Sequence, residues 1–255
     1  LQEAMALAGY DVATSVSRSS AALADSEVVI LLPPPSRTGL HSAQVHRTTN
    51  VALVRHYTKN IKQHAHRARI LVAIPPVNLL ASLMHYELEA EPGQVIGLST
   101  IRASAHLKSG IANQLQVSVT DVATLVVGND EKILALPQYC GANGIPLDQL
   151  LSNSQIRELT EGVDEWRRVS AHADSFYSLS VCLRQIVTAI ALDKKQIMSV
   201  GTLIQASTSA VYLSVPAKIG SNGVEEIIQL ELTDEQRPQF TQLVSRSIIN
   251  QQVKT

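Results

Sequence analysis

Two stretches decide the fold: SEVVILLPPP at residues 26–35 and RILVAIPP at residues 69–76. In each, a continuous run of apolar residues leads directly into prolines. A run without polar alternation is typical of a parallel strand whose two faces are both covered by helices. Because proline removes a backbone donor and opposes a helix, each run should end as a strand at its prolines. We therefore expect buried parallel strands over Ser26–Leu32 and Arg69–Ile74.

Helical patterns surround these two strands. Apolar residues at spacings of three and four predict helices over residues 43–64 and Val77–Leu88. The turn Glu91-Pro92-Gly93 then leads into a third short strand, Gln94–Leu98. Alternation of strand and helix predicts a parallel α/β sheet in the first hundred residues.

The second half has a different pattern, in which strands follow one another as neighbours and favour an α+β domain. We expect a domain boundary near Leu98–Ile101, which divides the chain into residues 1–99 and 100–255. The other elements expected from periodicity and turn residues are a helix at residues 1–8, strands at 11–16, 120–127, 197–203, 211–216 and 224–232, a loop at 138–150, and helices at 101–115, 152–168, 175–191 and after Thr233.

Composition limits the classes of function. The chain has 255 residues, of which 45% are hydrophobic and 17% charged, with a net charge of -1. A neutral balance argues against nucleic-acid binding, and no apolar run is long enough for membrane insertion. An average protein has about 25% charged residues, so we expect part of the surface to be covered in an assembly. The start at Leu1 predicts a processed or incomplete N-terminus, and the absence of a signal pattern favours the cytoplasm or an organelle matrix over secretion.

Several segments along the chain resemble those of lactate and malate dehydrogenases, and malate dehydrogenase is the nearer in appearance. The segments that carry the resemblance are SEVVILLPPPSR, RILVAIPPVNLL, QVIGLSTIRASAHLKSGIA, LVVGNDEKILALPQYCGANGIPL and VYLSVPAKIGSNGVEEIIQLELTDEQ. The resemblance implies an α/β fold: a partial Rossmann-like parallel-sheet domain, followed by the α+β C-terminal domain of these enzymes. It also implies an oligomer, because residues 1–8 resemble a helix that the family uses between subunits.

The chemistry that the resemblance implies is the NAD-dependent interconversion of a 2-hydroxy acid and a 2-oxo acid. Histidine accepts the hydroxyl proton, aspartate stabilises the imidazolium and arginine binds the substrate carboxylate. In the motif Asp-Ser-Ala-Arg, the aspartate is replaced by Ala103 and the arginine by His106. The loop Gly-His-Gly-Asp is shortened to Gly128-Asn129-Asp130, and the asparagine before Pro-Val is Pro75. We therefore expect no catalytic residue to remain.

A few residues still match positions of the family that bind substrate or cofactor. Arg37 takes the place of a substrate arginine, so Arg37 and His106 are the candidate substrate-binding residues. Asn50 matches an asparagine near the cofactor. No G-x-G-x-x-G is present, and Pro33-Pro34 stands where glycine and backbone donors approach the nucleotide. We expect no bound cofactor, or NAD if the chain is an active enzyme.

Each other chemical signal has a plainer structural explanation that we favour. His106 and Asp130 form a new acid–base pair only if the fold brings them together. His64 and His66 have metal-ligand spacing only in a strand, and we expect no metal site. Cys140 and Cys182 are too few for a disulfide scaffold and are expected to be buried.

Three functions are consistent with the sequence. The first is a pseudoenzyme: a malate/lactate dehydrogenase-like chain that has lost catalysis and NAD binding and serves as a structural or regulatory subunit, in a homo-oligomer or a larger complex. The second is an NAD-dependent malate dehydrogenase whose cofactor-binding N-terminus is missing from this chain. The third is a sensor that binds a small anion at Arg37 and His106. Without the family's first strands, the strand Ser26–Leu32 would be a bare apolar sheet edge. We therefore expect that residues absent from this chain supply those strands, that a partner covers the edge, or that the region rearranges.

Overall fold

The structure is a computed structural model that describes residues 2–7, 9–33, 43–170, 176–206 and 209–252. The helices are α1 (Gln2–Leu7), α2 (Ala43–His64), α3 (Val77–Leu88), α4 (Ile101–Leu115), α5 (Leu147–Leu150), α6 (Asn153–Ser170), α7 (Phe176–Ala191) and α8 (Gln236–Gln252). Short 3₁₀ helices are η1 (Ser20–Leu23), η2 (Val119–Asp121) and η3 (Pro137–Tyr139).

The strands form two sheets. They are β1 (Val28–Leu31), β2 (Arg69–Val72), β3 (Val95–Gly97), β4 (Val122–Ala123), β5 (Val126–Gly128), β6 (Ile133–Ala135), β7 (Gly141–Ala142), β8 (Ile145–Pro146), β9 (Gln196–Gln205), β10 (Ala210–Gly220) and β11 (Gly223–Ile227). The large sheet has the order β1-β2-β3-β9-β10-β5-β6, with β11 on β10, and the small one has the order β4-β7-β8.

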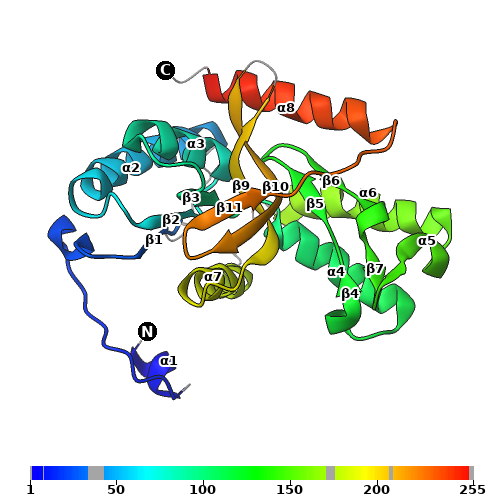
Figure 1. Cartoon of the computed structure of the whole chain (residues 1–255), viewed down its shortest axis with the longest axis horizontal. Helices are drawn as coiled ribbons and strands as arrows, with labels where there is room; N and C mark the ends of the chain where they lie inside the picture. The colour runs from blue at the N-terminus through cyan, green and yellow to red at the C-terminus, as the bar shows by residue number, and fades with distance from the viewer. Residues whose placement is uncertain (1, 8, 34–42, 171–175, 207–208, 253–255) are drawn as a thin grey trace.

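The large sheet changes from parallel to antiparallel between β3 and β9. Strands β1, β2 and β3 are parallel, as the sequence predicts. Gly97 of β3 then pairs with Gly201 of β9 in the antiparallel sense, and β9 continues into its hairpin with β10. One sheet therefore joins the two halves of the chain, and Figure 1 shows α2 and α3 at one end of it and α4 to α6 at the other.

Neighbouring residues of β2 pack into different cores, which explains its unbroken apolar sequence. Ile70 and Val72 belong to a core formed with α2 and α3. Leu71, which lies between them, belongs to a core on the other face of the sheet, with Ile186 of α7. A third core lies between α4, α6 and the small sheet. Both faces of the parallel strand are therefore covered, as expected for such a run.

Some predicted elements are wrong. Asp11–Val16 is not a strand: no other strand pairs with it among the described residues, and the side chain of Val16 is fully exposed. Thr120–Val127 is not one strand, because β4 pairs with β7 and β5 pairs with β6 and β10. The region 138–150 is not simply a loop, since it contains β7, β8 and α5. The strand predicted at 224–232 ends at Ile227.

Other predictions are confirmed. Helices α3 and α4 have the expected bounds. Thr233 caps the start of the last helix: its hydroxyl accepts from the backbone N–H of Gln236, and the Gln236 side chain accepts from the backbone N–H of Thr233. Within the described residues, β1 pairs only with β2 and forms the sheet edge, with Ile30 and Leu32 partly exposed.

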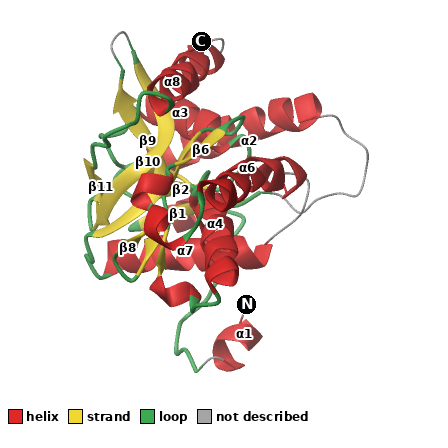
Figure 2. Cartoon of the chain, turned by 90° about the vertical axis from the view of Figure 1, so that its right-hand side faces the viewer, coloured by secondary structure: helices red, strands yellow, loops and turns green. Residues whose placement is uncertain are grey.

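Helix α1 lies away from the rest of the molecule. Figure 1 and Figure 2 both show it at the end of an extended arm that leads to η1. The arm exposes the apolar side chains of Leu7, Tyr10, Val12 and Val16. In the part of the chain that the structure covers, no helix is both long and apolar enough to span a membrane.

Candidate functional site

The positions where the resemblance places catalysis come from three parts of the fold. The β5–β6 hairpin carries Asn129 and Asp130, the segment after β2 carries Pro75 and the start of α3, and α4 carries Ala103 and His106. Asn78 of α3 donates to the carbonyl of Gly128, at 3.3 Å, so the first two parts are in direct contact.

Asn129 is buried and its side chain is fully engaged. It directly follows Gly128, as histidine follows glycine in the family motif. Its amide nitrogen donates to the hydroxyl of Ser247 on α8, at 2.7 Å. Its amide oxygen accepts from the backbone N–H groups of Glu131 and Lys132, at 2.9 and 2.8 Å. Asn129 therefore closes the hairpin and fixes it to α8.

Asp130 caps helix α3. One carboxylate oxygen accepts from the backbone N–H of Val77 at 2.6 Å, and the other from those of Asn78 at 2.9 Å and Leu79 at 3.4 Å. The residue before the helix is Pro76, which has no side-chain cap to offer, so Asp130 satisfies the donors that a helix start leaves open. Burial raises the pKa of Asp130 to about 6, against the lowering effect of the three N–H groups.

The side chain of Asn78 fills the space between the backbones of Gly97, Gly128 and Gly201. Its side-chain oxygen accepts from the hydroxyl of Ser214, at 3.4 Å. A Cβ atom added to Gly201 would lie 2.2 Å from that oxygen, and one added to Gly97 would lie 3.2 Å from it. Glycine on β3 and β9 is therefore required by an internal side chain, not by a bound molecule.

His106 and Asp130 do not form an acid–base pair. His106 stacks on Trp166 of α6, with ring centroids 4.7 Å apart and planes at 10°. Asp130 meets α6 through its backbone carbonyl, which accepts from Arg167 at 3.1 Å. Burial lowers the pKa of His106. The aspartate that would orient a histidine is Ala103, which packs in the third core.

The other predicted site residues remain predictions. Asn50 of α2 donates its amide to the carbonyl of Pro75 at 2.7 Å, so it contacts the segment that leads into α3. Arg37 lies outside the described residues. Cys140 and Cys182 are free, buried thiols. His64, His66 and the other described residues form no group of three or more His, Cys, Asp or Glu that would hold a metal ion.

The cavity beside Asp130 is small, with a volume of about 50 Å³. Its walls are residues of α2, α3, the β5–β6 hairpin and α8: Arg47, Pro76, Asn78, Leu79, Asn129, Asp130, Glu131, Ser247, Asn250 and Gln251. Sites for small organic ligands occupy roughly 300–1,000 Å³. The described part of this cavity therefore has room for a water molecule or a small ion.

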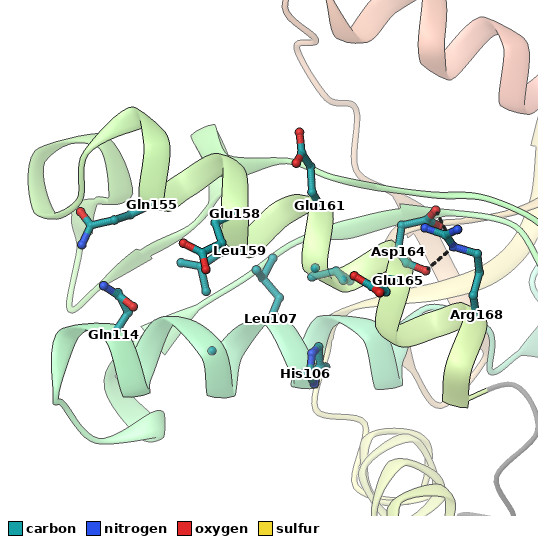
Figure 3. Close-up of a pocket in the computed structure, with 13 residues that line it drawn as sticks. His106, Leu107, Gln114, Gln155, Glu158, Leu159, Glu161, Asp164, Glu165 and Arg168 are labelled. Carbon is teal, nitrogen blue, oxygen red and sulfur yellow. Dashed lines mark hydrogen bonds and ion pairs between the residues drawn. The ribbon is translucent and has the colours of Figure 1, made fainter.

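A far larger groove, of about 810 Å³, lies between α4 and α6. In Figure 3, Gln114 and Gln155 lie at one end of it, and Asp164, Glu165 and Arg168 at the other. His106 contributes to its wall, so of the two predicted substrate residues the one that is described faces this groove.

Comparison with known proteins identifies the family. The family described as "lactate/malate dehydrogenase, alpha/beta C-terminal domain" matches residues 97–254. This is more than half of the chain, which therefore belongs to the lactate/malate dehydrogenase family.

Its relatives are mostly enzymes of malate. The malate dehydrogenase of Bacillus pumilus is 29% identical over 249 residues, which cover 95% of this chain and 80% of the relative. That of Heliobacterium modesticaldum is 29% identical, covering 96% and 81%. Among solved structures, the malate dehydrogenase of Aeropyrum pernix has a TM-score of 0.88 at 25% identity, covering 99% of this chain and 84% of that one. A lactate dehydrogenase of Cryptosporidium parvum, solved with lactic acid and nicotinamide adenine dinucleotide, shares the fold, with a TM-score of 0.88 at 20% identity over 99% and 83% of the two chains.

The bonding roles of Asn129, Asp130 and Asn78 are not evident from the sequence. One signal was present: the helix at Val77 starts after two prolines without a capping side chain. Such a start requires an acceptor from elsewhere, but nothing local indicates that Asp130 supplies it.

Proposed function

We propose that this chain is a member of the lactate/malate dehydrogenase family that has lost catalysis and NAD binding and serves as a structural or regulatory subunit. The observation that carries the proposal is the bonding of Asn129. Hydride transfer from a hydroxy acid requires a group that takes up the hydroxyl proton. A carboxamide does not take up a proton near neutral pH. In Asn129, the amide nitrogen and the amide oxygen both already form hydrogen bonds within the protein.

Asp130 does not substitute for the missing base. Its pKa of about 6 suits proton transfer, but both of its oxygens accept from the start of α3. A general base must reach the proton that it removes. The part of the cavity beside Asp130 that the described residues enclose, about 50 Å³, is too small for a hydroxy acid with a nicotinamide ring.

The described residues also fit NAD poorly. Dinucleotide binding in a Rossmann fold uses backbone N–H groups and glycines at the carboxyl ends of the parallel strands. Here β1 is followed by Leu32 and Pro33, and proline has no N–H. We therefore propose that the chain binds no NAD.

The second candidate is an NAD-dependent malate dehydrogenase that interconverts malate and oxaloacetate. The names of the relatives support it, and they support it better than they support a loss of catalysis. In this case Arg37 and His106 would contact the substrate and Asn50 the cofactor.

Two measurements on the purified chain distinguish the candidates. The first follows NADH absorbance with oxaloacetate and with pyruvate, and the second measures NADH and malate binding by calorimetry. We expect no turnover above a protein-free blank and no heat of binding. Turnover that is lost in Arg37→Ala but kept in Arg157→Ala, at an exposed arginine outside both cavities, would establish the second candidate instead. Binding of malate without turnover would favour an anion sensor.

We also propose that the chain assembles, as a homo-oligomer or as part of a larger complex. The arm that carries α1 exposes Leu7 and Val16 almost completely, at 91% and 101%. An apolar arm that the described residues leave exposed is typical of a segment that contacts another subunit. Light scattering of the purified chain, with and without residues 1–19, measures this directly.

A further inference from the structure

The groove between α4 and α6 has the shape of a binding site for an elongated ligand. Its lining includes Leu159 of α6, which is partly exposed, whereas Leu107 of α4 and Val163 of α6 lie beneath the surface in the third core. Helix α4 has 15 residues and α6 has 18, which at 1.5 Å per residue gives lengths of about 22 and 27 Å. Figure 3 shows the polar residues of α6 along this length.

The wall that α6 contributes is acidic and not neutralised. Glu158, Glu161 and Glu165 all line the groove, and none forms an ion pair with another described residue. Asp164 differs, because Arg167 and Arg168 pair with it. The three glutamates are spaced three and four residues apart, so like charges stand next to each other on one helical face.

The same face contains a glycine for which the described residues give no packing reason. Gly162 is in the middle of α6, where glycine weakens a helix relative to alanine. A Cβ atom added there would have no atom within 4 Å. By contrast, a Cβ on Gly110, the facing glycine of α4, would lie 3.0 Å from Leu159, so this second glycine has a packing reason.

Unpaired glutamates of like charge and a glycine in mid-helix both lower the stability of α6. When such residues lie together on one surface, they indicate that the surface has a function. We propose that the groove binds a basic amphipathic helix of a partner protein, an inference that rests on the proposed role as a subunit of an assembly. Lysine or arginine side chains of the partner pair with Glu158, Glu161 and Glu165. Its apolar side chains pack on the partly exposed Leu159, and its backbone approaches α6 where Gly162 has no side chain.

A synthetic peptide tests the proposal on the full chain. The probe is a fluorescein-labelled leucine–lysine peptide of about 14 residues, long enough to span most of the groove as a helix, with leucine at spacings of three and four. Its matched control has glutamate in place of every lysine. We expect the lysine peptide to bind with micromolar affinity by fluorescence anisotropy, more weakly at higher salt, and the glutamate peptide to bind at least tenfold more weakly.

Gly162→Leu is the decisive variant. Leucine fills the open wall of the groove and is a better helix former than glycine, so the variant should unfold at a higher temperature while its affinity for the peptide falls at least tenfold. The double variant Glu158→Lys, Glu165→Lys should lose binding to the same extent.

Three results would overturn the inference. One is equal binding of the two peptides, and another is undiminished binding by Gly162→Leu. The third is a chain that forms a dimer on its own and becomes a monomer on Gly162→Leu, because a second copy would then fill the groove. None of these results bears on the loss of catalysis, which the NADH measurements decide separately.

Discussion

Replacing Asp130 by asparagine should change how the stability of the protein depends on pH. The carboxyl is partly buried at the start of α3, and this burial raises its pKa from 3.8 to about 6 in the folded protein. Folded chains therefore keep this proton to higher pH than unfolded ones. Its contribution to stability is complete below about pH 4 and is lost as the pH rises through about 6. A difference of about two pKa units corresponds to about 3 kcal/mol.

Asparagine has nearly the same shape but does not titrate. Its side-chain oxygen still accepts from the start of α3, whereas its nitrogen faces N–H donors, so the variant should lose about 1 kcal/mol of capping energy at low pH. As the pH rises from 4 to 7, the free energy of unfolding of the variant, measured relative to that of the natural chain, should increase by about 3 kcal/mol.

Urea unfolding, followed by the fluorescence of the single tryptophan, Trp166, measures both proteins over this range. Asp121→Asn, at an exposed aspartate, is the control and should show no such change. If the difference between the Asp130 variant and the natural chain is constant with pH, burial does not dominate the titration. If it changes in the opposite direction, the N–H groups of α3 hold the carboxylate ionised, and the reasoning is refuted.

Three further predictions concern packing, capping and reactivity. Gly201→Ala should lower the free energy of unfolding by about 1–3 kcal/mol, because a Cβ atom there would lie 2.2 Å from the Asn78 oxygen. Chemical denaturation measures this change. Gly162→Ala is the control and should stabilise the chain by up to about 1 kcal/mol. Thr233→Ala should cost about 1 kcal/mol through the lost cap of α8, and Thr233→Ser should restore most of it. Cys140 and Cys182 are buried, and burial raises the pKa of both thiols. A thiol reagent at pH 8 should therefore label them only after the chain unfolds. Fast labelling of the native chain would contradict their buried positions.

The fold was predictable where a segment carries its own signals. Val77–Leu88 follows two prolines and Ile101–Leu115 has clear apolar periodicity, so both helices have the bounds that the sequence predicts. Asp11–Val16 has residues that suit a strand, but a strand also requires a neighbour, and none of the described strands pairs with it.

At the candidate site, the sequence shows which residues are present but not what they bind. Ala103, His106 and Asn129 can be read directly from the sequence. The present bonding of these residues depends on contacts across more than 50 positions, such as Asn129 with Ser247 and Asp130 with Val77. The groove between α4 and α6 is another such case, because Glu158 and Gly162 look like ordinary surface residues until α4 is placed beside them.

The pairing of Gly97 with Gly201 has a consequence for how the molecule can be divided. The two halves are paired within one sheet, so a cut between β3 and α4 would turn β3 in one half and β9 in the other into open sheet edges. Separate expression of residues 1–99 and 100–255 should therefore give insoluble fragments that become soluble when they are made together. A foreign domain joined at this point would need a strand that pairs with β3 or with β9, so we expect most such chimaeras not to fold.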